Sequence, residues 1–251
     1  MKINIWRNRA FKSSAQVLGY SSQATNYPAI NAISTSPTQK WRTTGRAAEY
    51  ISIDFGIADI ITAIGIYGSN LTDNAQITLY LSDNSDFSGA TQINLMGSQV
   101  KDKMYNLGAS YTNRYAKIAI ADTGNSASYL EIGTIWLAGK DLELQPTEFS
   151  EKVNIKDIYD TSYNIVGFYL SRPSLRNWSL TARITSSDDV TMLQTIIDEN
   201  KTSVPFYIES DDDSQIVGHP ITTFTRFSET PEINYVYVNY WTASADLIET
   251  R

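Results

Sequence analysis

The fold is decided by a segment in which apolar and polar side chains alternate, Tyr50-Ile51-Ser52-Ile53-Asp54-Phe55. Alternation with a period of two, in β-branched and aromatic residues, is typical of a strand that buries one face. The same pattern recurs in the first half of the chain at residues 63–67, 76–81, 115–120 and 129–137. The sequence therefore predicts a series of short strands.

Short polar spacers separate these runs, and they are rich in residues that favour turns. Examples are Gly68-Ser69-Asn70, Ser82-Asp83-Asn84-Ser85 and Asp122-Thr123-Gly124-Asn125. Such residues form turns through a positive φ or through side-chain hydrogen bonds to the backbone. No segment of useful length with a helical period precedes residue 140. Many short strands joined by turns predict an antiparallel sandwich or barrel.

The composition fits a chain that folds around packed cores. The 251 residues are 42% hydrophobic and 19% charged, and none is a cysteine, which excludes disulfides and thiol catalysis. The length predicts one large domain or two modest ones. No apolar run approaches the ~18 residues that a membrane-spanning helix needs. The first residues, 1–11, lack the apolar core of a secretory signal, so we expect neither a membrane role nor an export signal.

Charge is distributed unevenly along the chain. Residues 1–140 contain 12 Lys and Arg against 9 Asp and Glu, whereas residues 141–251 contain 8 against 18. An acidic chain does not favour phosphate contacts, so we expect no nucleic-acid partner. Pro146 follows the charge break, and proline is disfavoured in a central strand. The sequence therefore predicts a domain at 1–140, a linker at 141–150 and a second domain at 151–251.

The second half combines strand-like runs with one helix. The runs lie at residues 165–170, 178–184, 204–209, 221–227 and 233–242. A helix is predicted at about 187–200, because Ser186 or Ser187 can cap it. Asp188 and Asp189 complement the positive end of its dipole. The apolar side chains that follow share one face, which predicts packing on a sheet: Val190, Leu193, Ile196 and Ile197.

The last run, residues 233–242, is apolar on both faces of the expected strand. Tyr235, Tyr237 and Trp241 share one of these faces. A long strand with two apolar faces is an aggregation risk unless both are covered. We expect these three residues to form an interface between copies of the chain, which would associate as a homo-oligomer. A strand buried within its own sandwich is the alternative.

Residues that carry chemistry are scarce. His219 is the only histidine, it precedes a proline, and no nucleophile motif accompanies it. No glycine-rich nucleotide loop is present. The run from Asp211 to Asp213 lacks the spacing of a calcium loop and is typical of a solvated turn. We therefore expect no catalytic residue, no metal and no cofactor. A glycan-active enzyme that uses two of the 27 acidic residues is the alternative.

Aromatic and arginine side chains give the strongest indication of a ligand site. The segment from Tyr20 to Arg46 is long for a loop, which indicates either function or irregular strands. Exposed Tyr and Trp present a large apolar face with a polar tip, and they suit both sugars and proteins. The candidate ligand-binding residues are Tyr27, Trp41, Arg42, Arg46 and Asn70. For Trp41 the alternative is a core position at the end of the sandwich.

Residues 10–139 resemble the discoidin, or coagulation factor 5/8 C-type, family of galactose-binding-like jelly rolls. The resemblance is carried by three segments in the family's order, Tyr27-Pro28-Ala29-Ile30-Asn31-Ala32-Ile33, Lys40-Trp41-Arg42-Thr43 and Glu49-Tyr50-Ile51-Ser52-Ile53-Asp54-Phe55-Gly56. It implies a jelly-roll sandwich that binds glycans, lipid headgroups or proteins through loops at one end. Ser34 stands where the family often has an Asp that supports a loop or a calcium ion.

Residues 150–251 more faintly resemble phage tail proteins of the distal-tail and tube type. The segments that carry this resemblance are Asn177-Trp178-Ser179-Leu180-Thr181-Ala182-Arg183-Ile184, the expected helix and Ser203-Val204-Pro205-Phe206-Tyr207-Ile208. The resemblance implies a β-sandwich with one helix that forms rings around the tail axis. The predicted fold class is therefore mainly β, with a galactose-binding-like jelly-roll sandwich followed by a β-sandwich domain with one packed α-helix.

Together these patterns predict a structural virion protein of a phage tail tip or baseplate, a distal-tail-like ring component that is not an enzyme. Its expected partners are further copies of itself, other tail or baseplate proteins and a host-surface glycan. Its expected location is the virion tail, assembled in the host cytoplasm. The alternative is a stand-alone carbohydrate-binding module or adhesin.

Overall fold

A computed structural model describes most of the chain, in seven segments: residues 2–36, 38–154, 157–159, 169–171, 175–210, 222–237 and 240–249. His219 and the run from Asp211 to Asp213 lie outside the described residues. In the described part, no helix is long and apolar enough to cross a membrane. The same residues contain no group of three or more His, Cys, Asp or Glu that could hold a metal ion.

The chain divides into two compact units. The N-terminal unit is Arg7–Lys140, and the C-terminal unit combines Met1–Trp6 with Asp141–Arg251. The sequence placed the first six residues in the N-terminal domain, and the structure corrects this assignment. Strand β1 (Ile3–Asn8) pairs with β13 (Phe206–Ser210), from Ile3 opposite Ser210 to Trp6 opposite Tyr207. The backbone partners of these residues therefore lie in the other half of the chain.

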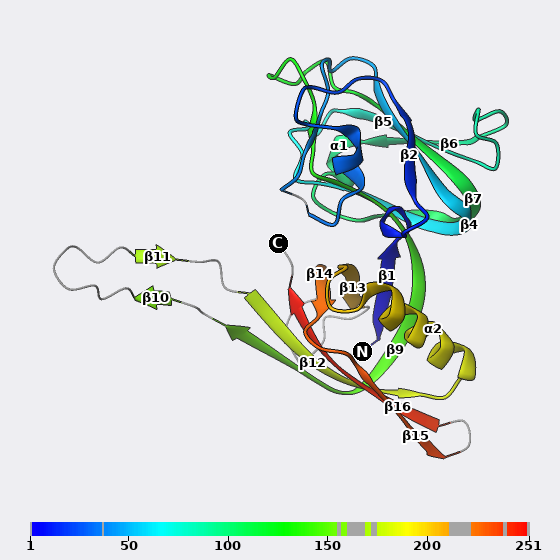
Figure 1. Cartoon of the computed structure of the whole chain (residues 1–251), viewed down its shortest axis with the longest axis vertical. Helices are drawn as coiled ribbons and strands as arrows, with labels where there is room; N and C mark the ends of the chain where they lie inside the picture. Colours follow the sequence, from blue (N-terminus) through cyan, green and yellow to red (C-terminus); the bar gives the residue numbers. More distant parts are fainter. Residues whose placement is uncertain are drawn as a thin grey trace. The chain divides into compact units, whose positions relative to one another are not determined.

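The N-terminal unit is built from antiparallel strands with short helical turns (Figure 1). Its elements after β1 are η1 (Arg9–Phe11), β2 (Gln16–Tyr20), η2 (Ala29–Ile33), β3 (Trp41–Arg42), β4 (Glu49–Tyr67), β5 (Gln76–Ser82), β6 (Thr91–Met96), α1 (Gly97–Val100), β7 (Tyr105–Ala121), β8 (Glu131–Ile132) and the first part of β9 (Thr134–Asn154). The order of its main strands is β9-β4-β7-β5-β6, and β2 pairs with the first part of β4 on the edge away from β7.

Strand β4 bends, and this bend turns one sheet into two layers. Its first part, including Ile51 and Ile53, pairs with β2 and with the second part of β7. Irregular pairing between Asp54 and Asp59 marks the bend, and the last part, residues 63–67, pairs with β9. Strands that change sheets through bulges are a known way to close a sandwich. The inward side chains of both layers form one core, in which Trp41 and Phe55 have no exposed surface.

The C-terminal unit is a second β structure with one long helix. Its further elements are β10 (Asp157–Tyr159), β11 (Tyr169–Ser171), β12 (Leu175–Ile184), α2 (Ser187–Asn200), β13, β14 (Thr222–Phe227), β15 (Glu232–Tyr237) and β16 (Tyr240–Glu249). The main strands follow the order β1-β13-β14-β16-β12-β9, and β15 pairs with β16. Helix α2 spans the residues at which the sequence predicts a helix, with the Ser186 hydroxyl accepting from the N–H groups of Asp188 and Asp189. Leu193, Ile196 and Ile197 are buried in the core of this unit.

The expected linker is instead part of a strand. Residues 141–150 lie within β9, which continues from Thr134 to Asn154 and pairs with β12. Proline is tolerated there because the pairing is irregular: Glu148 faces Thr181 and Pro146 faces Ala182, so Thr147 is the extra residue of a bulge. The segment lacks the character of a linker because its backbone is hydrogen-bonded into a sheet.

The expected last strand is a hairpin. Strand β15 ends at Tyr237, β16 begins at Tyr240, and Tyr235 pairs with Trp241 across the two strands. The alternation of residues 233–242 did not reveal the reversal between these two strands. The fold class is nevertheless confirmed: the chain is mainly β, and one packed helix lies in the second unit.

Candidate ligand-binding site

A short ladder in the N-terminal unit positions the candidate residues. In β3, Arg42 lies opposite Glu131 of β8. On its other side, the Ala24 N–H donates to the Arg42 carbonyl at 2.7 Å, and the Arg42 N–H donates to the Tyr27 carbonyl at 3.3 Å. Asn26 has a φ of 67°, in the left-handed region that Asn tolerates, and this reverses the chain between Ala24 and Tyr27. The ladder therefore brings Tyr27, Arg42 and Glu131 together.

Arg42 is the centre of the site. Its guanidinium carbon lies 4.0 Å from the ring centroid of Tyr27 and 4.6 Å from that of Tyr129. Its Nε and Nη2 both donate to Oε1 of Glu131, at 3.0 Å and 2.5 Å. The hydrogen bond to Glu131 raises the pKa of Arg42 above its ordinary value, and burial opposes that rise. The side chains of Arg42 and Glu131 are 28% and 20% exposed, so a ligand can reach this pair.

Trp41 has a different place from its neighbour. The sequence names it as a candidate ligand contact with a core position as the alternative, and the alternative holds, because its side chain is fully buried. Its Nε1 donates to the Ser22 carbonyl at 2.9 Å, which attaches the segment before Tyr27 to the core. Trp41 is therefore a support beneath the site, because a side chain without exposed surface cannot touch a ligand.

Arg46 and Asn70 hold the loop that carries Tyr129. Nη1 of Arg46 donates to the carbonyls of Asn125 and Ala127. Nδ2 of Asn70 donates to the Tyr129 carbonyl at 3.2 Å, and its Oδ1 accepts from the N–H of Glu131 at 2.7 Å. Both residues are half-buried. Their polar atoms face the protein's own backbone, so they position the site rather than form its contact surface.

The same loop is fixed from below by a buried carboxylate. Asp122 accepts from the Thr72 N–H at 2.8 Å and from the Thr72 hydroxyl at 2.6 Å. Nδ2 of Asn125 donates to Asp122 at 3.1 Å and to the Asn70 carbonyl at 2.8 Å. Asp122 and Asn125 are both buried. Buried polar groups with partners define one conformation of the loop.

Two residues of the site were missed by the sequence reasoning, Tyr129 and Glu131. They alternate with the buried Leu130 at the start of a predicted strand, and this alternation placed both on one outward face. What the sequence did not show was the partner strand: the two-residue pairing of β3 with β8 joins positions almost 90 residues apart.

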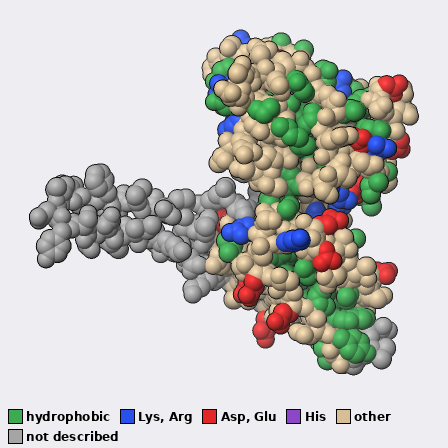
Figure 2. Space-filling view, viewed as in Figure 1, with side chains coloured by type: hydrophobic (Ala, Val, Ile, Leu, Met, Phe, Trp, Pro, Cys, Tyr) green, Lys and Arg blue, Asp and Glu red, His purple; other side chains and the backbone are tan. Residues whose placement is uncertain are grey.

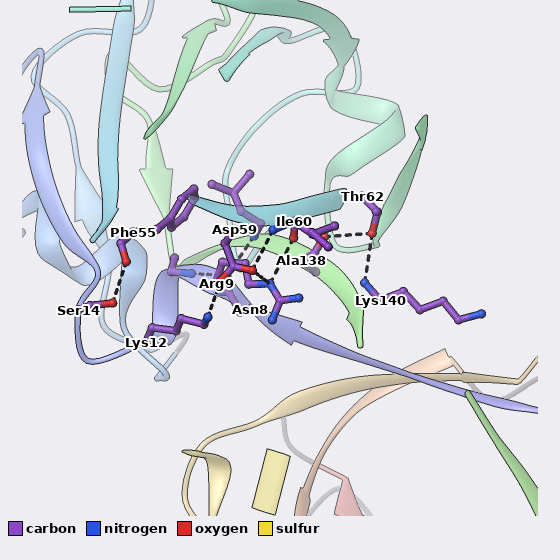
Figure 3. Close-up of polar contacts among 12 residues, drawn as sticks. Asn8, Arg9, Lys12, Ser14, Phe55, Asp59, Ile60, Thr62, Ala138 and Lys140 are labelled. Carbon is purple, nitrogen blue, oxygen red and sulfur yellow. Dashed lines mark hydrogen bonds and ion pairs between the residues drawn. The ribbon is translucent and has the colours of Figure 1, made fainter. Parts of the chain in front are cut away.

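A second group of charges in this unit is structural. Nε of Arg9 lies 3.2 Å from Oδ1 of Asp59 and donates to the Ile60 carbonyl at 3.2 Å (Figure 3). Lys12 pairs with the other oxygen of Asp59, and Lys140 and Thr62 are joined by a backbone-to-hydroxyl bond of 3.2 Å. Arg9 is only 3% exposed. The charges of Arg9 and Lys12 are thus satisfied within the unit, and their bonds hold η1 and the residue after it against β4.

The expected interface residues lie on the β15–β16 hairpin. Tyr235 is 62% exposed, and its ring lies 5.9 Å from that of Trp241 in an edge-to-face arrangement. Val236 beside it is 51% exposed, and hydrophobic side chains gather over this hairpin (Figure 2). The side chain of Tyr237 lies outside the described residues. Tyr235 and Trp241 therefore share one face, across the two strands of a hairpin rather than along one strand, and their role as an interface stays a prediction.

Comparisons with known proteins find similarity in solved structures. No protein-family model matches the chain, and no curated protein matches it. A Ruminococcus gnavus GH29 fucosidase in complex with fucose is 19% identical, with a TM-score of 0.43, over 53% of this chain and 26% of that chain. The chain therefore spans about a quarter of the length of that enzyme.

Two smaller proteins are matched over their whole length. A chitosan-binding module of a Paenibacillus chitosanase/glucanase is 16% identical, with a TM-score of 0.42, over 53% of this chain and 99% of that one. The family 32 carbohydrate-binding module of C. perfringens NanJ, in complex with galactose, is 14% identical, with a TM-score of 0.42, over 55% and 100%. The resemblance of residues 150–251 to phage tail proteins stays a prediction.

Proposed function

We propose that the N-terminal unit binds a saccharide at Arg42. The observation that carries the proposal is the arrangement of Arg42 between the rings of Tyr27 and Tyr129, paired with Glu131 on an accessible surface. The role proposed is binding without a chemical step.

The chemistry of this group matches that of a sugar. A pyranose has apolar C–H faces and hydroxyl groups that both donate and accept hydrogen bonds. Tyr27 and Tyr129 supply half-buried aromatic surface, and aromatic rings with a polar tip suit such a face. Arg42 supplies N–H donors and Glu131 supplies a carboxylate acceptor. A donor and an acceptor held side by side can engage two neighbouring hydroxyls of one sugar ring.

The site is also organised before a ligand arrives. The hydrogen bonds of Asn70 fix the backbone at Tyr129 and Glu131, and the buried Trp41 fixes the opposite segment. Ordering a loop on binding costs free energy, so a loop that is already ordered supports affinity from few contacts. This fits a binding module whose contacts come from an ordered surface.

A glycan array tests the proposal. Fucose, galactose and chitosan oligosaccharides are the first sugars to include, because they are named with the proteins to which this chain is similar. The full chain should bind at least one neutral glycan, and Arg42→Ala should lose that binding, while the matched control Lys103→Ala, an exposed charge elsewhere in the unit, keeps it. Equal binding by wild type and Arg42→Ala would overturn the site assignment.

Association between copies is a second proposal, and the exposed hairpin is the observation that favours it. Tyr235 and Val236 are consecutive, exposed apolar residues of β15, which among the described strands pairs with β16 alone. Adjacent exposed apolar residues are typical of interaction sites. The structural role in a phage tail that the sequence predicts requires such self-association. In light scattering, the full chain should form an oligomer that Val236→Asp disrupts, and a wild-type monomer at high concentration would contradict this second proposal.

The proposed absence of catalysis has its own test. Purified protein incubated with polysaccharides should release no reducing ends above a heat-treated control. Release that disappears when one carboxylate, such as Glu131, is changed to Gln would show that the chain is an enzyme.

A further inference from the structure

The outer face of the main sheet in the N-terminal unit carries a cluster that the Arg42 site does not use. Lys117 of β7 lies opposite Tyr80 of β5, and Tyr50 of β4 lies opposite Ala119, two residues further along β7. The residues that alternate with them, such as Ile118, point into the core. Tyr50, Tyr80 and Lys117 therefore share the face that points away from the core.

The ammonium group of Lys117 is surrounded by aromatic rings. Its Nζ lies 4.6 Å from the ring centroid of Tyr50, 5.7 Å from that of Tyr80 and 6.0 Å from that of Phe87. Rings at such distances attract a cation through their negative faces. The side chains of Lys117, Tyr50, Tyr80 and Phe87 are all half-buried, so each keeps part of its surface accessible to a ligand.

Within the described residues, Lys117 has no hydrogen-bond or ion-pair acceptor. Among residues 2–36 and 38–154, which describe the unit almost completely, no carboxylate pairs with it and no oxygen accepts a hydrogen bond from it. Two other lysines differ, since Lys12 pairs with Asp59 and Lys40 donates to the Gly68 carbonyl at 2.6 Å. An ammonium has three N–H donors, and the rings satisfy its charge without accepting conventional hydrogen bonds. The donors of Lys117 remain available to an anion.

Phe87 is held in a strained conformation next to Lys117. Its φ is 60°, a value that bulky residues rarely adopt. Its turn is nevertheless well fixed, because Nδ2 of Asn84 donates to the Ser88 carbonyl at 3.1 Å and Oδ1 of Asp86 accepts from the Ser88 N–H at 2.9 Å. The Ser88 N–H also lowers the pKa of Asp86. Backbone strain that the surrounding structure maintains is frequent at ligand-binding sites, and the half-buried Phe87 ring keeps part of its surface accessible.

We propose that this cluster, the Lys117 platform of Tyr50, Tyr80, Phe87 and Lys117, binds an acidic saccharide. A carboxylate or sulfate of the sugar accepts from Lys117, and a pyranose face lies against an aromatic ring. The platform is separate from Arg42, and the proposal does not depend on a neutral sugar binding there.

The charge of Lys117 and the polar side chains near it favour an acidic saccharide as the ligand. A positive charge without a carboxylate partner favours an anion over a neutral ligand. The strands beside the rings carry amides and a hydroxyl on the same face, with Gln92 opposite Tyr80 and Asn94 opposite Thr78. The Thr78 hydroxyl and Nε2 of Gln92 each lie 3.2 Å from Oδ1 of Asn94. Such groups can both donate hydrogen bonds to sugar hydroxyls and accept them.

The experiment is a calorimetric titration of the full chain with three probes: an oligogalacturonate, a neutral galactose oligosaccharide of the same length, and a sulfated oligosaccharide. An acidic probe should bind, and its affinity should fall as salt is added. Lys117→Met, which keeps the apolar stem, should weaken acidic binding about tenfold or more, since charge-assisted hydrogen bonds are the strong ones. Lys117→Arg should keep most of the affinity. Binding of the oligogalacturonate would identify a carboxylate as the anion that the platform accepts. Binding of the sulfated probe alone would identify a sulfate. Either result supports the proposal.

Arg42→Ala separates this proposal from the proposed function. Acidic binding that survives Arg42→Ala and is lost in Lys117→Met supports the platform, whatever happens to the neutral probe. Acidic binding that is lost in Arg42→Ala and kept in Lys117→Met overturns it, as does the absence of binding by either acidic probe. If Lys117→Met does not fold, Phe87→Gly gives the same test. Glycine relieves the left-handed strain, so this variant should fold at least as stably and bind the acidic probe more weakly; unchanged affinity would overturn the proposal.

Discussion

Two arginines of the N-terminal unit use the same interactions for different purposes. Arg114 donates from Nε and Nη2 to the two oxygens of Asp54, at 2.9 Å and 3.0 Å, and its guanidinium lies 5.0 Å from the Tyr115 ring. Asp54 is buried and also accepts from the Gly56 N–H at 2.7 Å. Arg42 instead directs both of its N–H donors to one oxygen of an accessible carboxylate, between two rings.

The two pairs differ in whether a carboxylate oxygen remains outside the ion pair and accessible to a ligand. Both oxygens of Asp54 are occupied by the protein, and the group stands next to the bend of β4, so this pair stabilises the fold. The Arg42–Glu131 pair lies at the surface with one carboxylate oxygen outside the ion pair. An arginine on a ring with a carboxylate partner is therefore no sign of a binding site by itself. The burial and saturation of the carboxylate separate structural from functional pairs.

The largest effect should come from the core beneath Arg42. Trp41→Ala removes a fully buried ring together with its hydrogen bond to Ser22, and it should lower the free energy of unfolding by about 3–5 kcal/mol. Sugar binding should be lost with it, because the segment before Tyr27 loses its anchor. A denaturant titration measures the change. A shift within about 0.5 kcal/mol would mean that Trp41 is not a core residue.

A matched change in the other unit should leave both arginines undisturbed. Leu193 on α2 is 3% exposed, and Leu193→Ala should cost about 2–5 kcal/mol through lost contacts and a cavity. Saccharide binding measured below the unfolding transition should stay as in wild type. Loss of binding without loss of folding would show that α2 acts on the Arg42 site.

Arg114→Ala should affect stability but not binding. It leaves the buried Asp54 carboxylate with only part of its hydrogen bonds, and a buried charge without its partner is unfavourable. The melting temperature should fall by several degrees, whereas glycan affinity should be unchanged. A variant with wild-type melting temperature would place Arg114–Asp54 among the surface pairs that contribute little.

The smallest effect should appear as a pH dependence. The hydrogen bond from Arg114, followed by the N–H of Gly56, lowers the pKa of Asp54 against the opposing effect of burial. Its contribution to stability is therefore complete above the unfolded value of about 4 and is lost as the pH falls through the lower folded pKa. Melting temperatures measured from pH 7 to pH 3 should fall more steeply for wild type than for Asp54→Asn. Parallel curves would contradict the assignment.

The sequence predicted those features that depend on local pattern. Alternation gave the strands that contain Ile51 and Ile118, and the cap at Ser186 with its apolar face gave α2. Features that depend on distant pairing could not be read in this way. Thr147 is a bulge residue only because β12 lies opposite, so the segment around Pro146 resembled a linker. Trp41 resembled a ligand contact because neither aromatic type nor neighbouring arginines reveal burial.

In the candidate site, too, the sequence predicted what depends on residue type and missed what depends on distant strand pairing. Tyr27 and Arg42 were predicted from residue type, and the structure brings them into contact. Glu131 and Tyr129 lie beside these residues because β3 pairs with β8. This short pairing cannot be predicted from a local sequence pattern. Asn70, predicted as a contact, instead supports the loop through bonds that are visible only once the turn is folded.

The central claim is tested most directly by titrating the best glycan from the array into three proteins: wild type, Arg42→Ala and Arg114→Ala. The account predicts that Arg42→Ala weakens binding about tenfold or more, as expected for the loss of charge-assisted contacts. Arg114→Ala should retain the wild-type dissociation constant despite its lower melting temperature. Equal weakening in both variants, or wild-type affinity in Arg42→Ala, would contradict the assignment of Arg42 as the centre of a saccharide site.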